Sequence, residues 1–157
     1  MEKENSTATA VSEDNSGFPT IPNWYIIAMV FALVWNLMGV MAFVDQMMMS
    51  AEALERLTPE QRNYFENIPM LANIAFAFAV FGGTLGCASM LIKKGLAVTF
   101  FKLSLGGVVV QMLYAVVLSN SIEVFGPSSL AMPIMVTLIA IVLLSFSLKA
   151  KRCGWIN

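Results

Sequence analysis

Long apolar runs alternate with short polar segments along the chain, and four of the runs are long enough to cross a lipid bilayer. They are residues 24–44, 68–92, 97–118 and 130–148. A hydrocarbon core about 30 Å thick requires about 20 helical residues. Because lipid offers no partner to backbone N–H and C=O groups, each run is predicted to be helical. Short links make such helices antiparallel neighbours, so the pattern predicts an all-α, polytopic membrane four-helix bundle over residues 23–149.

The composition supports a membrane protein and argues against most enzyme classes. Of the 157 residues, 58% are hydrophobic and only 12% are charged, whereas soluble domains carry about 25% charged residues. The net charge of −1 gives no attraction to nucleic acid. The chain has no histidine, and Cys87 and Cys153 show no metal-ligand spacing. We therefore expect no catalytic, cofactor-binding or metal-binding residues and no enzymatic activity.

The distribution of Lys and Arg predicts how the chain crosses the membrane. Residues 1–22 are acidic and polar and are predicted to be a disordered tail. The connections on the opposite side of the membrane carry only Arg56 and Arg62. Seven basic residues lie on the side of the two termini: Lys3, Lys93, Lys94, Lys102, Lys149, Lys151 and Arg152. Retained positive charge marks the cytoplasmic side, so both termini, including a basic tail at residues 150–157, are predicted to be cytoplasmic.

The first outer connection has sequence signals for helices of its own. Ser50 is placed to cap a first short helix, and Thr58, Pro59 and Gln61 form a capping-box pattern for a second. Apolar residues recur within the segment at helical spacing. We expect amphipathic helices over residues 51–66 in this outer loop.

Small residues follow one face of the second span. Ala75, Ala79, Gly83 and Cys87 recur every four residues, and Gly82 and Gly86 form a GxxxG pattern beside them. Small side chains at this spacing let a second helix backbone approach closely in lipid. The six residues are predicted to be a helix-packing face, with a partner either within the chain or in another copy.

Polar residues inside the spans form a candidate intramembrane cluster. They are Asn36, Asn73, Gln111 and Tyr114. A side-chain amide in hydrocarbon is costly unless it is hydrogen-bonded. Gln111 is the expected partner of Asn36, and Asn73 lies nearer the outer side. Such bonds contribute about 0.6 kcal/mol on average, so a role in helix register and a role in holding a polar solute both remain open.

Several short motifs together resemble a family of small four-span proteins of Gram-negative bacteria that are often labelled "sugar transporter". These motifs are WNLMG, LTPEQRNYFENIP, AVFGGTLGC, SLGGVVVQMLY, AMP and the closing GWI. The resemblance covers most of the chain beyond residue 22 and implies a bacterial inner-membrane protein. It carries over no catalytic or substrate-binding residue. Cys153 departs from the family pattern, which has a basic or small residue at that position.

Two functions are consistent with these features. The leading hypothesis is a non-enzymatic interaction or accessory protein, in which the outer loop and the small-residue face contact a second copy or another membrane protein. The alternative is a homo-oligomeric carrier of a small, sugar-like solute, with the polar cluster lining a cavity at the membrane midplane.

Overall fold

The computed structural model describes residues 21–119 and 121–157, and its secondary-structure elements in these ranges are helices. The four longest helices are apolar. Two of them adjoin a short helix, and when these short helices are counted in, the four spans contain 25, 22, 23 and 26 residues. The spans are α1 (Asn23–Met47), α4 (Met70–Leu91), α5 (Leu96–Leu113), which continues as a π-helix, η1 (Tyr114–Leu118), and α7 (Ala131–Arg152), which follows a 3-10 turn, η2 (Pro127–Leu130). The predicted all-α membrane bundle is confirmed, and the chain is a multi-pass membrane protein.

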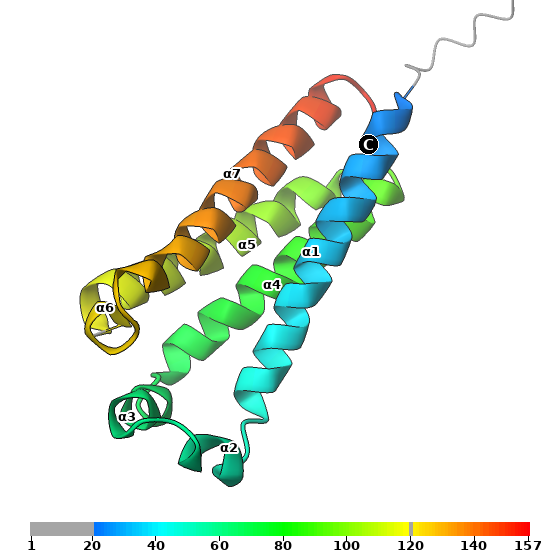
Figure 1. The fold of residues 1–157 in the computed structure, drawn as a ribbon. Coiled ribbons are helices and arrows are strands. Elements are labelled where there is room, and N and C mark those ends of the chain that lie inside the picture. Colours follow the sequence, from blue (N-terminus) through cyan, green and yellow to red (C-terminus); the bar gives the residue numbers. More distant parts are fainter. Residues whose placement is uncertain (1–20, 120) are drawn as a thin grey trace, which may run out of the picture.

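The four spans are arranged with α4 and α5 at the centre (Figure 1). Helix α1 packs against α4, and α7 packs against α5. The central pair is close because Gly107 of α5 faces the backbone of Ala75 and Ala79 on α4, where a side chain would not fit. The two outer helices, α1 and α7, diverge from one end of the bundle toward the other (Figure 1).

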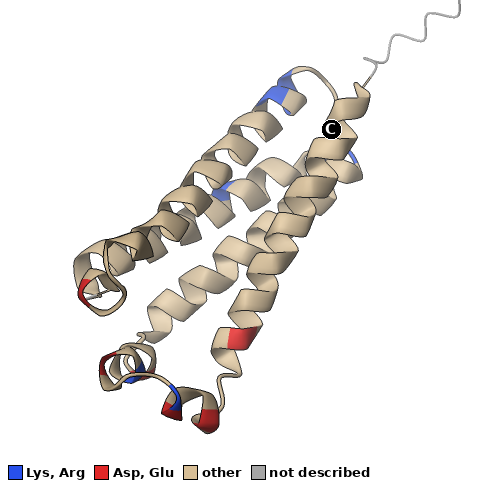
Figure 2. Ribbon diagram, viewed as in Figure 1, with Lys and Arg blue, Asp and Glu red and all other residues tan. Residues whose placement is uncertain are grey.

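The two ends of the bundle differ in charge (Figure 2). We call the end that holds the start of α1, the α4–α5 turn and the end of α7 the terminal end. It carries Lys93 and Lys94 in the turn and a basic last turn of α7. The opposite end, called the loop end, holds the acidic short helices. The bundle is therefore polarised along its length.

Aromatic side chains fill the core at the terminal end and join α1 to α7. Tyr25 is only 2% exposed, and its hydroxyl donates a hydrogen bond to the carbonyl of Met90 at 2.9 Å. The Tyr25 ring centroid lies 5.5 Å from that of Phe146 and 5.7 Å from that of Trp155. Edge and tilted ring contacts of this kind add stability beyond the buried area. The larger of the two clusters of buried apolar residues includes Tyr25, Met90 and Ile156 at this end.

Part of the segment predicted as a basic tail packs against the bundle, although Lys151, Arg152 and Cys153 are exposed. Helix α7 extends to Arg152, where its basic last turn interacts favourably with the helix dipole. After it the chain folds over the α4–α5 turn, so that Ile156 is buried. The backbone N–H of Asn157 donates to the carbonyl of Lys93 at 3.1 Å, and Gly95 N–H donates to the carbonyl of Asn157. Of the tail predicted at the other terminus, residues 1–22, only Ile21 and Pro22 lie in the described part of the chain.

The predicted helices in the first connection are both present. Helix α2 (Ala51–Glu55) is capped by Ser50, and α3 (Pro59–Glu66) has the capping box between Thr58 and Gln61. The Nε–H of Arg62 donates to the carbonyl of Leu54 at 3.2 Å and so ties α3 to α2.

The second connection packs against the first at the loop end. It contains the short helix α6 (Ser121–Phe125), and the ring of Phe125 lies 5.2 Å from that of Tyr64 and 6.1 Å from that of Phe65, measured between centroids. These aromatic contacts hold α6 beside α3, so that the two loop-end connections form one surface.

Candidate functional site

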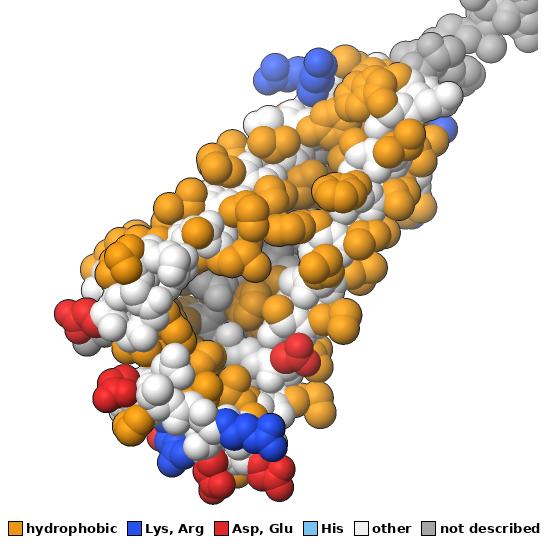
Figure 3. Space-filling model, in the orientation of Figure 1, with side chains coloured by type: hydrophobic (Ala, Val, Ile, Leu, Met, Phe, Trp, Pro, Cys, Tyr) orange, Lys and Arg blue, Asp and Glu red, His pale blue; other side chains and the backbone are white. Residues whose placement is uncertain are grey.

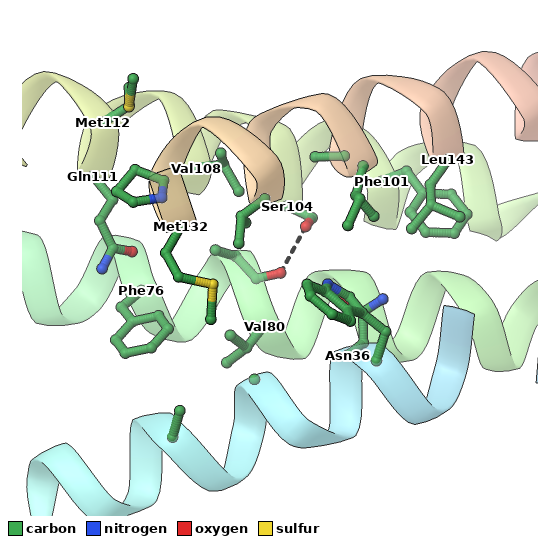
Figure 4. A pocket seen from close by; sticks show the side chains of 18 residues that line it. Asn36, Phe76, Val80, Phe101, Ser104, Val108, Gln111, Met112, Met132 and Leu143 are labelled. Carbon is green, nitrogen blue, oxygen red and sulfur yellow. Dashed lines mark hydrogen bonds between the residues drawn. The ribbon is translucent and has the colours of Figure 1, made fainter. Parts of the chain in front are cut away.

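A groove lies between α1 and α7, and all four spans line it (Figures 3 and 4). Its cavity has a volume of about 260 Å³. Helices α1 and α7 form the two walls, while α4 and α5 form the floor. Most of the lining is carbon, from side chains such as Phe76, Val80, Val108, Val136 and Leu143. The groove exists because the two wall helices meet through the aromatic core at the terminal end and diverge beyond it (Figure 1).

Three amide or hydroxyl side chains line the groove, and two of them already have partners. The Ser104 hydroxyl donates to the carbonyl of Ala79 at 2.6 Å, across the α4–α5 contact. Asn36 donates through Nδ2 to the carbonyl of Ala32 at 2.8 Å. Gln111 is the third, and it lies on α5 well along the groove from Asn36 (Figure 4). The hydrogen-bonding capacity left for a ligand is small compared with the apolar surface.

The expected hydrogen bond between Asn36 and Gln111 is not formed. Asn36 Nδ2 instead donates to the carbonyl of Ala32 within α1 and lies 3.7 Å from Cys87 Sγ on α4. The physical reason is the packing order, since α1 contacts α4 rather than α5. Gly83 makes room for the amide, because a Cβ at that position would overlap Asn36 Oδ1. Asn36 therefore serves the α1–α4 contact, and both amides border the same groove without pairing.

The other two members of the predicted polar cluster lie elsewhere. Asn73 Oδ1 accepts a hydrogen bond from Gln46 Nε2 at 2.9 Å, which links α4 to the last turns of α1. Tyr114 begins the π-helical turn and lines a separate cavity at the loop end. The four residues are thus distributed over three local environments rather than gathered into one polar site.

The small-residue face of α4 is used within the chain. All six of its predicted members are buried: Ala75, Ala79, Gly82, Gly83, Gly86 and Cys87. Gly82 faces the backbone of α5, where a Cβ would lie 3.0 Å from the Ser104 nitrogen, and Gly86 faces the Phe101 ring. Gly83 faces α1 through Asn36. The face therefore packs against α5 and α1, and its close-packing positions are occupied without a second copy.

A second cavity, which we call the loop-end cleft, lies between α3, η1 and the α6 connection. Its volume is about 840 Å³. Hydroxyl, amide and carboxylate side chains dominate its lining: Thr58, Glu60, Gln61, Asn63, Tyr64, Asn67, Tyr114, Ser119 and Glu123. Sequence reasoning did not find this cleft, because its residues come from two connections whose proximity depends on the aromatic contacts of Phe125. The signal of this cleft in the sequence was the presence of polar residues at the ends of two apolar runs.

The described residues contain no group of three or more His, Cys, Asp or Glu side chains placed to hold a metal ion. The candidate site consists of the apolar groove and the polar loop-end cleft. Compared with known proteins, the chain matches no protein-family model, no curated protein and no solved structure.

Proposed function

We propose that this chain is a non-enzymatic protein of the bacterial inner membrane that binds the apolar chain of a lipid-like molecule between α1 and α7. The observation that supports this most strongly is the groove itself, a carbon-lined cavity of about 260 Å³ bordered by four membrane spans. Ligand sites in proteins are concave and mostly apolar, with a few polar groups that fix orientation. Gln111 is suited to that second role, because the Asn36 amide already donates to the carbonyl of Ala32.

The size of the groove favours a single chain over a helix as its occupant. A helix about 10 Å across that crosses about 30 Å of hydrocarbon occupies on the order of 2,000 Å³. All the empty space in the groove, including the part that opens to the surroundings, comes to about 1020 Å³, which is about half of this volume. A partner helix would therefore have to rest over the opening, whereas an extended hydrocarbon chain could enter it.

A polar solute fits the groove less well than an apolar chain. Each hydroxyl of a sugar-like ligand needs a hydrogen-bond partner when it leaves water. The amide and hydroxyl side chains among the lining residues are Asn36, Ser104 and Gln111, and the Ser104 hydroxyl already donates to Ala79. The sugar-like carrier suggested by the resemblance therefore receives little support from this geometry.

One surface supports the alternative proposal of an interaction or accessory protein. The small-residue face is occupied within the chain, but α2 and α3 have no buried residue of their own. An accessory protein would present these two helices to a partner membrane protein or to a second copy. This second proposed function predicts a stable complex that does not depend on the groove.

Filling the groove is expected to abolish binding of a hydrocarbon chain. Val136 lines the groove on α7, so Val136→Phe places a ring in the cavity. In a Trp24→Phe/Trp155→Phe background, Trp35, which also lines the groove, is the single tryptophan. A single-chain amphiphile brominated near the middle of its chain should quench Trp35 fluorescence saturably at one equivalent. Val136→Phe should remove this saturable quenching.

The control for this experiment is Leu138→Phe, two residues along the same helix on an exposed position. It should bind like the parent. Ala42→Phe, on the opposite wall, provides a second groove-filling variant if Val136→Phe does not fold. Quenching that rises linearly with amphiphile, or that is the same in the groove-filling and control variants, would rule out the groove as a binding site.

The proposed orientation places the terminal end in the cytoplasm. It is supported by the basic residues of the α4–α5 turn and of the last turn of α7. Cys153 is exposed at this end and Cys87 is buried, so the native chain has one accessible thiol among these two. A membrane-impermeant maleimide should label Cys153 in inverted membrane vesicles and leave it unlabelled in intact spheroplasts. The reverse pattern would contradict the orientation.

A further inference from the structure

The groove and the loop-end cleft follow one another along α5. Gln111 lines the groove, and Tyr114 lines the cleft. Three helical residues correspond to a rise of about 4.5 Å, so the two side chains lie on successive turns of one face. A molecule whose chain occupies the groove would therefore reach the cleft with its polar end. Tyr114 stands where the apolar lining gives way to the polar lining.

The cleft lining has the chemistry of a site for positive charge. Glu60 and Glu123 contribute carboxylates from the two loop-end connections, and the lining residues that the structure describes include no Lys or Arg. Tyr64 and Tyr114 add aromatic rings, and aromatic faces attract organic cations by about 0.5–1 kcal/mol at exposed sites. An anionic headgroup would meet two carboxylates and no counter-charge.

The surroundings of the cleft are negatively charged, like its lining. In the described part of the chain, six acidic residues and two arginines lie at the loop end: Asp45, Glu52, Glu55, Glu60, Glu66, Glu123, Arg56 and Arg62 (Figures 2 and 3). The Arg62 side chain donates to the carbonyl of Leu54 on α2. A field of one sign raises the local concentration of ligands with the opposite sign.

We infer that the ligand is an amphiphilic cation, whose hydrocarbon chain lies in the groove between α1 and α7 and whose amine or quaternary ammonium headgroup lies in the loop-end cleft between Glu60 and Glu123. This inference rests on the proposed function, because it requires the groove to hold the chain. It adds the chemical class of the ligand and its direction in the membrane. The apolar lining selects the chain, and the carboxylates and tyrosines of the cleft select the headgroup.

The test compares two brominated amphiphiles that differ only in headgroup. One carries a trimethylammonium group and the other a sulfate group, and both are titrated against the single-Trp35 protein in neutral detergent. The trimethylammonium compound should bind with a Kd at least about tenfold lower than that of the sulfate compound. Glu60→Gln and Glu123→Gln should each weaken binding of the cation by about threefold and leave binding of the sulfate compound unchanged or stronger.

The matched control removes the same charge outside the cleft. Glu52 and Glu55 lie on α2 and do not line the cavity, so Glu52→Gln/Glu55→Gln should change the Kd of the cation by less than about twofold. An equal loss in the control and in Glu60→Gln/Glu123→Gln would overturn the assignment of the headgroup to the cleft. If both headgroups bound equally and Val136→Phe still abolished binding, the proposal of a cationic headgroup would be wrong, whereas the proposal that the groove binds the chain would stand. Absence of any quenching sensitive to Val136→Phe would overturn both proposals.

Discussion

Gly107→Val is expected to force α4 away from α5 and to lower the free energy of unfolding by about 3 kcal/mol. A Cβ at Gly107 would lie 2.5 Å from the carbonyl oxygen of Ala75 and 2.8 Å from the nitrogen of Ala79. Both are backbone atoms, so neither can rotate away as the end of a side chain could. The helices must separate, and the close packing between the two central spans is lost.

The neighbouring glycine provides the control for this substitution. A Cβ at Gly106 would have no other atom within 4 Å, so Gly106→Val should stay within about 0.5 kcal/mol of the parent. The free energies are compared by unfolding the purified protein with increasing mole fractions of sodium dodecyl sulfate and following its circular dichroism. Equal destabilisation by the two substitutions would show that Gly107 does not face α4 as described.

Tyr25→Ala is expected to destabilise the terminal end of the bundle by about 3–5 kcal/mol, the range for large aromatic side chains removed from a core. Tyr25 packs against Phe146 of α7 and Trp155 of the tail, and it donates to the carbonyl of Met90 on α4. It thus joins three parts of the chain at the point where α1 and α7 meet. Its loss would also release the constraint that sets the angle between the walls of the groove.

Two further substitutions distinguish the contribution of the Tyr25 ring to stability from that of its hydroxyl group. Tyr25→Phe should cost about 1 kcal/mol, the usual net value of one hydrogen bond. Phe31→Ala removes an aromatic ring from the same helix at a position that is 74% exposed, and it should have the smallest effect of the three. The same denaturation assay measures all three variants. If Tyr25→Ala were no more destabilising than Phe31→Ala, the aromatic core at the terminal end would not hold α1 to α7.

The spans and the loop helices could be predicted because local physics determines them. Hydrocarbon thickness sets the length of an apolar helix, and the ends of the spans differ from the prediction by only a few residues. The caps at Ser50 and Thr58 depend on neighbours three residues away, so sequence spacing is enough to find them. The small residues of α4 were likewise recognisable as a packing face, since small side chains at this spacing are typical of helix interfaces in lipid.

The groove could not be predicted, because the order of helices around the bundle is not encoded in apolar periodicity. Helix α1 exposes Ile27 and Phe31 to the surroundings and buries Met29 and Ala32, yet all four side chains are apolar. In water the buried face of a helix is marked by its hydrophobicity, whereas in lipid both faces are apolar. The Asn36–Gln111 pairing was wrong for this reason. The alignment of the loop-end cleft with the groove also depends on this order.

The central claim is that the groove holds an apolar chain, and native mass spectrometry of the protein released gently from its own membranes tests it most directly. The account predicts one low-mass, chain-bearing adduct on each wild-type protein, its retention in Leu138→Phe and its loss in Val136→Phe. A stoichiometric second protein without such an adduct, or an adduct retained equally by Val136→Phe, would contradict the account.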